Sequence, residues 1–150
     1  MSRRGRLDAV IAGGGVVGAA AALMLARQGW QVALVEPRQP PAWQRDVRDL
    51  RVFAFAPDNA ALLQELGVWG DVCAARVQPY RHMRVWDAAG GDPLRFDADT
   101  LGQQQLGWII ENTVLVDALW RALPQAGVRL HCPAQVATLD QDSAGVRVGL

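Results

Sequence analysis

The feature that most constrains this chain is a cluster of glycines between two short apolar runs. The runs Leu7–Ala12 and Gln31–Glu36 are typical of buried parallel strands. Between them, Val16–Gln28 is rich in alanine and leucine and lacks proline, which predicts a helix. Gly29 follows at the position where helices commonly end in a left-handed conformation. A strand, a glycine-rich turn, a helix and a second strand in about thirty residues predict a βαβ unit that binds a dinucleotide.

The turn has the spacing G-x-G-x-x-G, from Gly13 to Gly18. Gly13 permits the tight turn, Gly15 lets the backbone approach a pyrophosphate, and Gly18 lets the helix lie close to the sheet. The N–H groups and the positive dipole end at the helix start favour phosphates. The carboxylate of Glu36 can accept a hydrogen bond from a ribose hydroxyl, and this position argues against a glycine turn without a ligand. The cofactor-binding residues predicted in this unit are Gly13, Gly15, Val16, Val17, Gly18, Glu36 and Pro37.

Both FAD and NAD fit such a unit, and the residues after it separate the two hypotheses. An NAD domain should continue promptly with a second helix and a third parallel strand. Instead, residues 38–57 are charged, contain prolines and lack periodicity, which predicts a long functional loop. A helix with Asp58 as its N-cap and an antiparallel ribbon over residues 83–87 and 94–96 are then expected. This order favours FAD, with an NAD-dependent dehydrogenase as the alternative.

The rest of the chain continues the alternation of strands and helices. A strand over 108–111, a helix over 113–123 and strands over 128–132 and 136–139 are expected, followed by a turn and a last strand. We therefore predict an α/β, Rossmann-like fold with an antiparallel ribbon inserted in it. The last strand stops without a turn or a polar tail, which predicts a chain cut from a longer protein. A non-catalytic nucleotide-binding fragment is thus a third hypothesis.

Charge and residue content argue against several other classes. Fifteen basic residues balance fifteen acidic ones, which gives no electrostatic reason to expect nucleic acid or an anionic membrane as a partner. The two cysteines lie far apart, which favours a reducing, cytoplasmic setting. His82 and His131 have no further ligands at metal-binding spacing, so no metal site is predicted. Residues 9–26 are uncharged and follow arginines at 3, 4 and 6, as in a signal peptide or membrane span, but four glycines interrupt this run.

Several segments beyond the glycine motif resemble those of one family. Asp49–Ala56 is similar to D-x-R-x-x-A-L-S, with Phe55 and Ala56 in place of the usual Leu-Ser, and Leu106–Asn112 is similar to L-G-x-I-V-E-N. Further matching segments are Leu62–Trp69 and Met83–Asp87. Over nearly all of its 150 residues the chain resembles the FAD-dependent aromatic hydroxylases, and within them the ubiquinone-biosynthesis hydroxylases of the UbiH/UbiF/VisC type.

This resemblance implies a glutathione-reductase-type FAD-binding fold, of which residues 1–150 form the N-terminal part. Residues 80–110 would lead into or out of the strands of a substrate domain. The resemblance also implies that Arg51 lies near the flavin and the pyrophosphate, that Asn112 contacts the cofactor, and that Val136, on a strand, presents backbone groups to adenine. From the residues alone, the alternatives are that Arg51 is a solvated loop charge and that Asn112 is a helix cap.

The implied activity is that of a flavoprotein monooxygenase, in which NAD(P)H reduces FAD and oxygen hydroxylates a prenylated phenolic ring. The family's A-D-G-x-x-S and G-D-A-A-H segments do not occur in the chain, so we expect the fragment alone to be inactive and identify no catalytic residue. A prenylated substrate suggests an association with the surface of the inner membrane. Further partners to consider are other ubiquinone-biosynthesis proteins (a Ubi complex) and a second copy of the chain.

Overall fold

The computed structural model describes residues 6–150 and confirms the βαβ unit at the start of the chain. β1 (Ala9–Ala12), α1 (Val16–Arg27) and β2 (Val32–Val35) follow one another, and β1 pairs with β2 in parallel. β8 (Arg129–His131) pairs in parallel with the other edge of β2, so the strand order is β1-β2-β8. All four residues of β2 are buried, as expected for the central strand of a covered parallel sheet.

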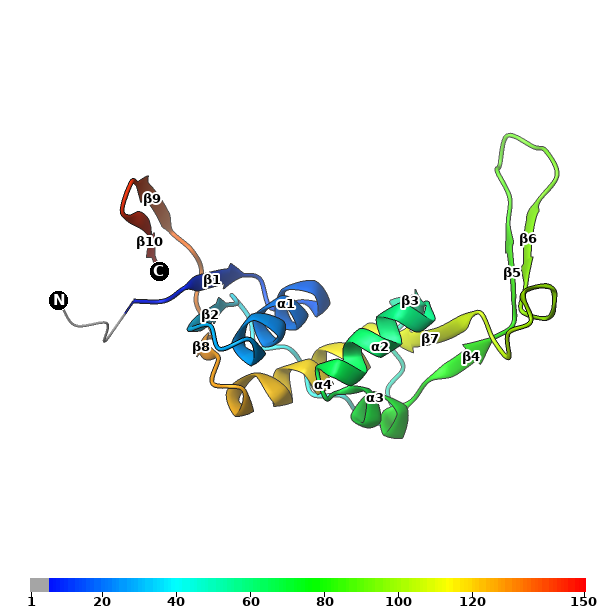
Figure 1. The fold of residues 1–150 in the computed structure, drawn as a ribbon, viewed down its shortest axis with the longest axis horizontal. Helices are drawn as coiled ribbons and strands as arrows, with labels where there is room; N and C mark the ends of the chain where they lie inside the picture. Colours follow the sequence, from blue (N-terminus) through cyan, green and yellow to red (C-terminus); the bar gives the residue numbers. More distant parts are fainter. Residues whose placement is uncertain (1–5) are drawn as a thin grey trace.

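Two helices cover this sheet and pack against each other (Figure 1). The predicted helix over 113–123 is α4 (Asn112–Gln125), and the small, fully buried side chains of Ala19 and Ala22 in α1 belong to the same core cluster as its buried residues. The buried residues of α4 are Val114, Leu115, Val116, Ala118, Leu119, Trp120 and Leu123. Fully burying a leucine or valine side chain stabilises the fold by about 1.5–3 kcal/mol, so α4 is the main support of the core.

A second, antiparallel sheet has the strand order β3-β7-β4. β3 (Val52–Phe55) and β4 (Gln78–Tyr80) lie on either side of β7 (Gly107–Glu111), which confirms the strand predicted over 108–111. The helices α2 (Pro57–Glu65) and α3 (Trp69–Ala75) connect β3 to β4. Because α4 follows β7 directly, this sheet fixes the start of α4.

Two expectations for this region were wrong. Residues 38–57 are not one continuous loop, because β3 occupies part of the segment and pairs with β7. Asp58 is not the N-cap of α2: Ala56 is, and Pro57 takes the first helical position, where its fixed φ and missing N–H are tolerated. The short elements α3 and β4 were not predicted.

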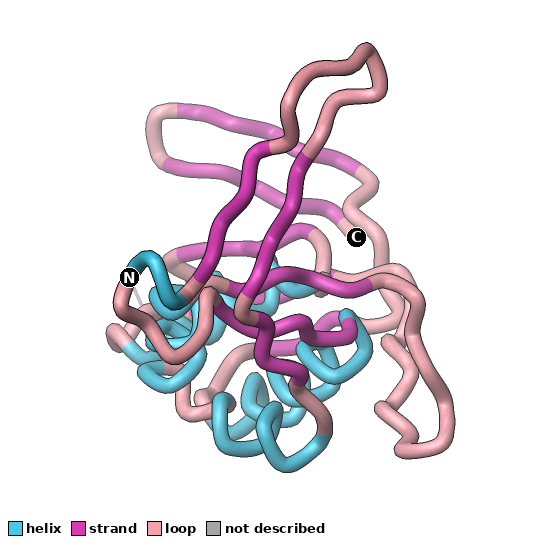
Figure 2. The backbone as a smooth tube through the Cα atoms, turned by 90° about the vertical axis from the view of Figure 1, so that its right-hand side faces the viewer, coloured by secondary structure: helices cyan, strands magenta, loops and turns pink. Residues whose placement is uncertain are grey.

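Two hairpins extend from the helical body (Figures 1 and 2). The predicted ribbon is confirmed as β5 (His82–Val85) and β6 (Leu94–Asp97), followed by the short 3-10 helix η1 (Asp99–Leu101). The second hairpin consists of β9 (Thr138–Asp142) and β10 (Gly145–Gly149). Within residues 6–150, no helix is long and apolar enough to cross a membrane, and two of the three arginines before the uncharged run lie outside the described residues.

Candidate cofactor-binding site

The glycine loop, residues 13–18, connects the carboxyl end of β1 to the start of α1. Gly13 has a φ of +101°, a left-handed conformation that favours glycine, and its N–H donates to the Val35 carbonyl at 2.8 Å. The first hydrogen bond of the helix runs from the Ala19 N–H to the Gly15 carbonyl at 2.9 Å. The N–H groups of residues 16–18 therefore precede the helical ladder and are available to an anion.

At two positions of the loop, the absence of a side chain matters for different reasons. A Cβ on Gly15 would meet no atom within 4 Å, so this direction opens into free space. A Cβ on Gly18 would collide with the carbonyl oxygen of Gly13, so the approach of α1 to β1 requires glycine there. Between them, the side chain of Val17 is 83% exposed at the first turn of α1. The loop is thus an open cradle that a side chain at position 15 would fill, which suits a pyrophosphate.

Glu36 faces this cradle from the carboxyl end of β2. Its Oε2 atom accepts a hydrogen bond from the Gly14 N–H at 2.7 Å, and its Oε1 accepts one from the Arg38 N–H at 3.2 Å. The Glu36 N–H also donates a hydrogen bond to the His131 carbonyl, and the Glu36 carbonyl accepts one from the Ala134 N–H, each at 3.0 Å. The carboxyl ends of all three parallel strands therefore meet here. Ligands of parallel α/β sheets bind at this edge. The structure therefore brings Glu36 together with residues 13–18, and the exposed Pro37 follows directly.

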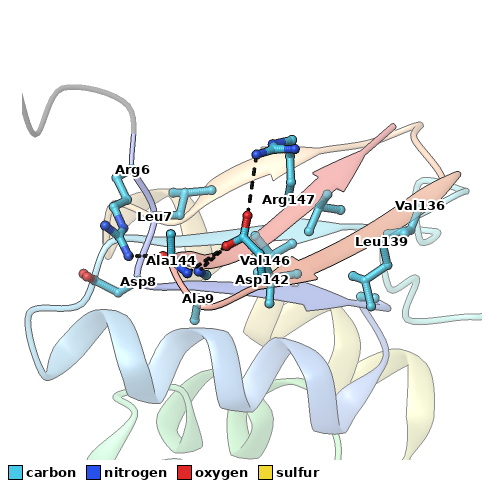
Figure 3. Close-up of a pocket in the computed structure, with 14 residues that line it drawn as sticks. Arg6, Leu7, Asp8, Ala9, Val136, Leu139, Asp142, Ala144, Val146 and Arg147 are labelled. Atoms are coloured by element: carbon cyan, nitrogen blue, oxygen red, sulfur yellow. Dashed lines mark hydrogen bonds and ion pairs between the residues drawn. The ribbon is translucent and has the colours of Figure 1, made fainter.

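Val136 does not lie on a strand, contrary to the expectation. It precedes β9, because the chain after His131 first passes Glu36 and only then forms the β9–β10 hairpin. With Leu139, Val136 lines an open cavity of about 870 Å³ between β1 and this hairpin (Figure 3). Its backbone contact with adenine stays a prediction, although the segment leading to it is bonded to Glu36.

A tryptophan of α4 holds the glycine loop from behind. The indole Nε1–H of Trp120 donates to the Gly14 carbonyl at 2.6 Å, and the ring occupies the space that a side chain on Gly14 would need. Trp120 is only 8% exposed, so this hydrogen bond is shielded from water. No sequence pattern indicated this contact, because the two residues are 106 positions apart.

We expect Trp120→Phe to destabilise the chain by about 1–3 kcal/mol, because the Gly14 carbonyl loses its buried hydrogen-bond donor. The affinity for FAD should fall as well, since the loop that receives the phosphates loses its support. Chemical unfolding and FAD titration measure the two effects. Trp30→Phe, a change at a tryptophan that is half exposed, is the control. Equal stability of the two variants would contradict the structural role of the Trp120 hydrogen bond.

Arg51 and Asn112 are in contact at the start of α4, away from Trp120. Asn112 is the first residue of this helix, and its N–H donates to the Arg51 carbonyl at 2.9 Å. The Arg51 side chain is 73% exposed, and its guanidinium binds both carboxylate oxygens of Asp49, each at 3.2 Å. Arg51 and Thr113 line an open cavity of about 440 Å³ together with residues 41–44 and 47–49. Since Asn112 lies about 12 Å from Trp120 along the helix axis, the site has two parts joined by α4.

Charged groups fix the geometry at this second part. Hydrogen bonds from the side chain and the backbone N–H of Arg51 hold the pKa of Asp49 below its ordinary value. Burial alone would raise the pKa of Glu111, but hydrogen bonds from Arg76 and the Asp49 N–H, with the charges of Arg76 and Arg48, outweigh it and lower that pKa. Glu111 is the N-cap residue of α4, so its charge lies directly before Asn112.

The ion pair of Glu111 predicts a specific pH dependence of stability. Its pKa in the folded chain lies below the ordinary 4.5, so the stabilisation is complete above that value and is lost as the pH falls through the folded-state pKa. We expect Glu111→Gln to lower the free energy of unfolding at about pH 7, and the difference from the unchanged protein to shrink in acid. Urea unfolding of both proteins across this range measures the difference. An undiminished difference at about pH 3 would contradict the ion pair.

The comparisons with known proteins agree with this geometry. Residues 8–60 match a family model described as FAD dependent oxidoreductase. The chain is 39% identical over 134 residues to the 3-demethoxyubiquinol 3-hydroxylase of Escherichia coli, which covers 88% of this chain and 34% of that protein. It is 37% identical over 122 residues to the ubiquinone biosynthesis monooxygenase COQ6 of Xenopus tropicalis, covering 77% and 26%. The chain thus spans about a third or less of the length of these relatives.

A solved structure shows the same fold. The anhydrotetracycline hydroxylase OxyS from Streptomyces rimosus matches with a TM-score of 0.70 and 23% identity, covering 95% of this chain and 28% of that one. Together, these likenesses confirm the FAD-binding fold and favour FAD over NAD as the dinucleotide. The chain is therefore similar over most of its length to the ubiquinone-biosynthesis hydroxylases, and residues 8–60 match the FAD dependent oxidoreductase family.

Proposed function

We propose that this chain forms the FAD-binding part of a monooxygenase that uses FAD and NAD(P)H to hydroxylate a prenylated phenolic ring in ubiquinone biosynthesis. The observation that carries the proposal is the open glycine cradle facing Glu36, which fits a dinucleotide with an unphosphorylated ribose. The printed names of the two relatives, a demethoxyubiquinol hydroxylase and a ubiquinone biosynthesis monooxygenase, support the reaction class. We therefore propose a phenol and oxygen as the substrates.

The chain's own residues would bind and orient the cofactor. The N–H groups of residues 16–18 would bind the pyrophosphate, Glu36 a ribose hydroxyl, and the backbone near Pro37 and Val136 the adenine side. Arg51 and Asn112 would lie toward the flavin, at the other end of α4. When bound, FAD supplies the redox chemistry that moves electrons from NAD(P)H to oxygen.

The β5–β6 ribbon is the part of the chain that we assign to the substrate side. Residues 80–110 would lead into or out of a substrate domain, and the large apolar side chains of Trp86, Leu94 and Phe96 on this ribbon are exposed. A cluster of exposed apolar side chains such as this one indicates a surface that another part of the protein covers. We further propose a cytoplasmic enzyme at the surface of the inner membrane, because a prenylated substrate partitions into lipid, with a Ubi complex or a second copy as protein partners.

The decisive test is cofactor binding by the purified protein. After incubation with FAD and gel filtration, we expect the protein to retain a flavin spectrum, and NAD added in place of FAD not to be retained. A protein that stays colourless and binds NAD would support the alternative of an NAD-dependent dehydrogenase. NAD(P)H oxidation by the FAD-bound chain in the presence of a phenol would contradict the alternative of a non-catalytic nucleotide-binding fragment.

A further inference from the structure

Arg76, the residue that ends α3, contacts the loop of residues 38–50 between β2 and β3. Its Nη1 atom donates to the Arg45 carbonyl at 3.0 Å, and its Nη2 donates to the Val47 carbonyl at 3.1 Å. The guanidinium also lies 5.6 Å from the centroid of the Trp43 ring, a cation–π distance. One side chain therefore binds this loop at three positions.

The same guanidinium binds Glu111 on its other side. Its Nε atom lies 2.8 Å from Oε1 of Glu111, and its Nη2 donates to Oε2 at 3.1 Å. Oε2 of Glu111 also accepts the Asp49 N–H at 3.1 Å. Only 22% of the Arg76 side chain and 12% of the Glu111 side chain are exposed, so water and salt screen this pair little. The loop is thus joined to the residue that precedes Asn112.

The neighbouring cation does not duplicate this role. Arg48 lies 3.7 Å from Oε1 of Glu111, but its side chain is exposed. Arg76 is therefore the cation that joins the loop backbone to the start of α4. The other charged side chain facing Glu111 is that of Arg48 in the loop, while Asp49 contacts Glu111 through its backbone N–H.

We propose that Arg76 is a positioning residue for the cofactor, which acts through Glu111 and the backbone of residues 45–49 to hold Arg51 and Asn112 in one geometry. The inference rests on the proposed function, because Arg51 and Asn112 matter as residues of an FAD site. Among the described residues, Arg76 itself makes no hydrogen bond or ion pair with Arg51 or Asn112. Its loss should therefore change the order of the loop and the affinity for FAD, and leave the core of α1 and α4 intact.

Limited trypsin digestion of the cofactor-free protein tests the anchoring directly. The peptide bond after Arg45 contains the carbonyl that Arg76 binds, and the bond after Arg48 contains the Asp49 N–H that Glu111 binds. In Arg76→Met we expect cleavage at these two bonds to be about tenfold faster, because cleavage follows the population of the open loop. Cleavage in the β5–β6 ribbon is the internal control. Arg76→Lys, which keeps the charge but not the fork of donors, should lie in between.

FAD titration of the same variants tests the link to the cofactor. We expect Arg76→Met to weaken FAD binding by about tenfold. Arg121→Met removes a half-exposed arginine whose ion pairs with Asp117 and with Asp71 of α3 are open to solvent, and it should change neither measurement. Faster cleavage with unchanged FAD affinity would overturn the positioning role, and so would unchanged cleavage. If Arg76→Met does not fold, Glu111→Gln replaces it with the same expectations. Failure of the unchanged protein to bind FAD would instead contradict the proposed function, and the cofactor role of Arg76 with it.

Discussion

Gly15→Val is expected to abolish FAD binding while the cofactor-free fold stays intact. Gly15 precedes α1 with a φ of −68°, which valine adopts without strain, and its Cβ would point into open space. That space is where the pyrophosphate must approach the backbone, so the valine side chain would occupy the position of the phosphates. The loss of glycine at the N-cap costs up to about 1 kcal/mol, too little to unfold a domain of this size.

The measurement is the flavin retained after gel filtration, together with the thermal unfolding of the cofactor-free protein. Gly70→Val is the matched control, because a Cβ at this position of α3 also meets no atom within 4 Å and Gly70 lies away from the glycine loop. Both variants should fold, and only Gly15→Val should be colourless. Flavin retained by Gly15→Val would show that the phosphates bind elsewhere.

Gly18→Ala, three residues further along the same motif, is expected to destabilise the fold. Its Cβ would collide with the Gly13 carbonyl oxygen, a backbone atom that cannot move aside as the end of a side chain can. Overpacking of this kind costs about 1–3 kcal/mol, and we expect the upper end of this range. FAD binding should weaken too, because relief of the collision must move α1 or the turn at Gly13.

Urea unfolding of Gly18→Ala and Gly70→Ala, compared with the unchanged protein, measures this cost. Gly70→Ala should be neutral or slightly stabilising, since alanine favours a helix more than glycine does. If Gly18→Ala proved as stable as the unchanged protein, the close packing of α1 on the turn would be wrong. The two glycines therefore separate binding from folding within one motif.

The first unit of the fold was predictable because its signals are local. Glycine positions, helix propensity and apolar runs within one short segment determine β1, α1 and β2, and the residues of the glycine motif and Glu36 do converge in the structure. The ribbon β5–β6 and the helix α4 were likewise predicted from their own residues. The roles of Arg51 and Asn112 came from the family resemblance, and their contact in the structure supports but does not test these roles.

The missed elements depend on partners far away in the sequence. β3 is four residues long and largely exposed, and only its pairing with β7, with Val52 opposite Glu111, makes it a strand. Val136 was placed on a strand because it is apolar, but the β9–β10 hairpin determines where β9 begins, two residues later. No local pattern indicates the hydrogen bond from Trp120 to Gly14 or the pairing of Arg76 with Glu111.

The hydrogen bond between Glu36 and the Gly14 N–H has a consequence for how fast a dinucleotide can enter. The bond keeps the glycine loop in shape in the absence of a ligand, so little conformational entropy is lost when the cofactor binds. When the cofactor arrives, its ribose hydroxyl would either replace the Gly14 N–H as hydrogen-bond donor to the Glu36 carboxylate or share that carboxylate with it. The carboxylate is already in place. Association should therefore be a single-step process whose rate rises in proportion to the concentration of FAD, without a slow rearrangement of the loop.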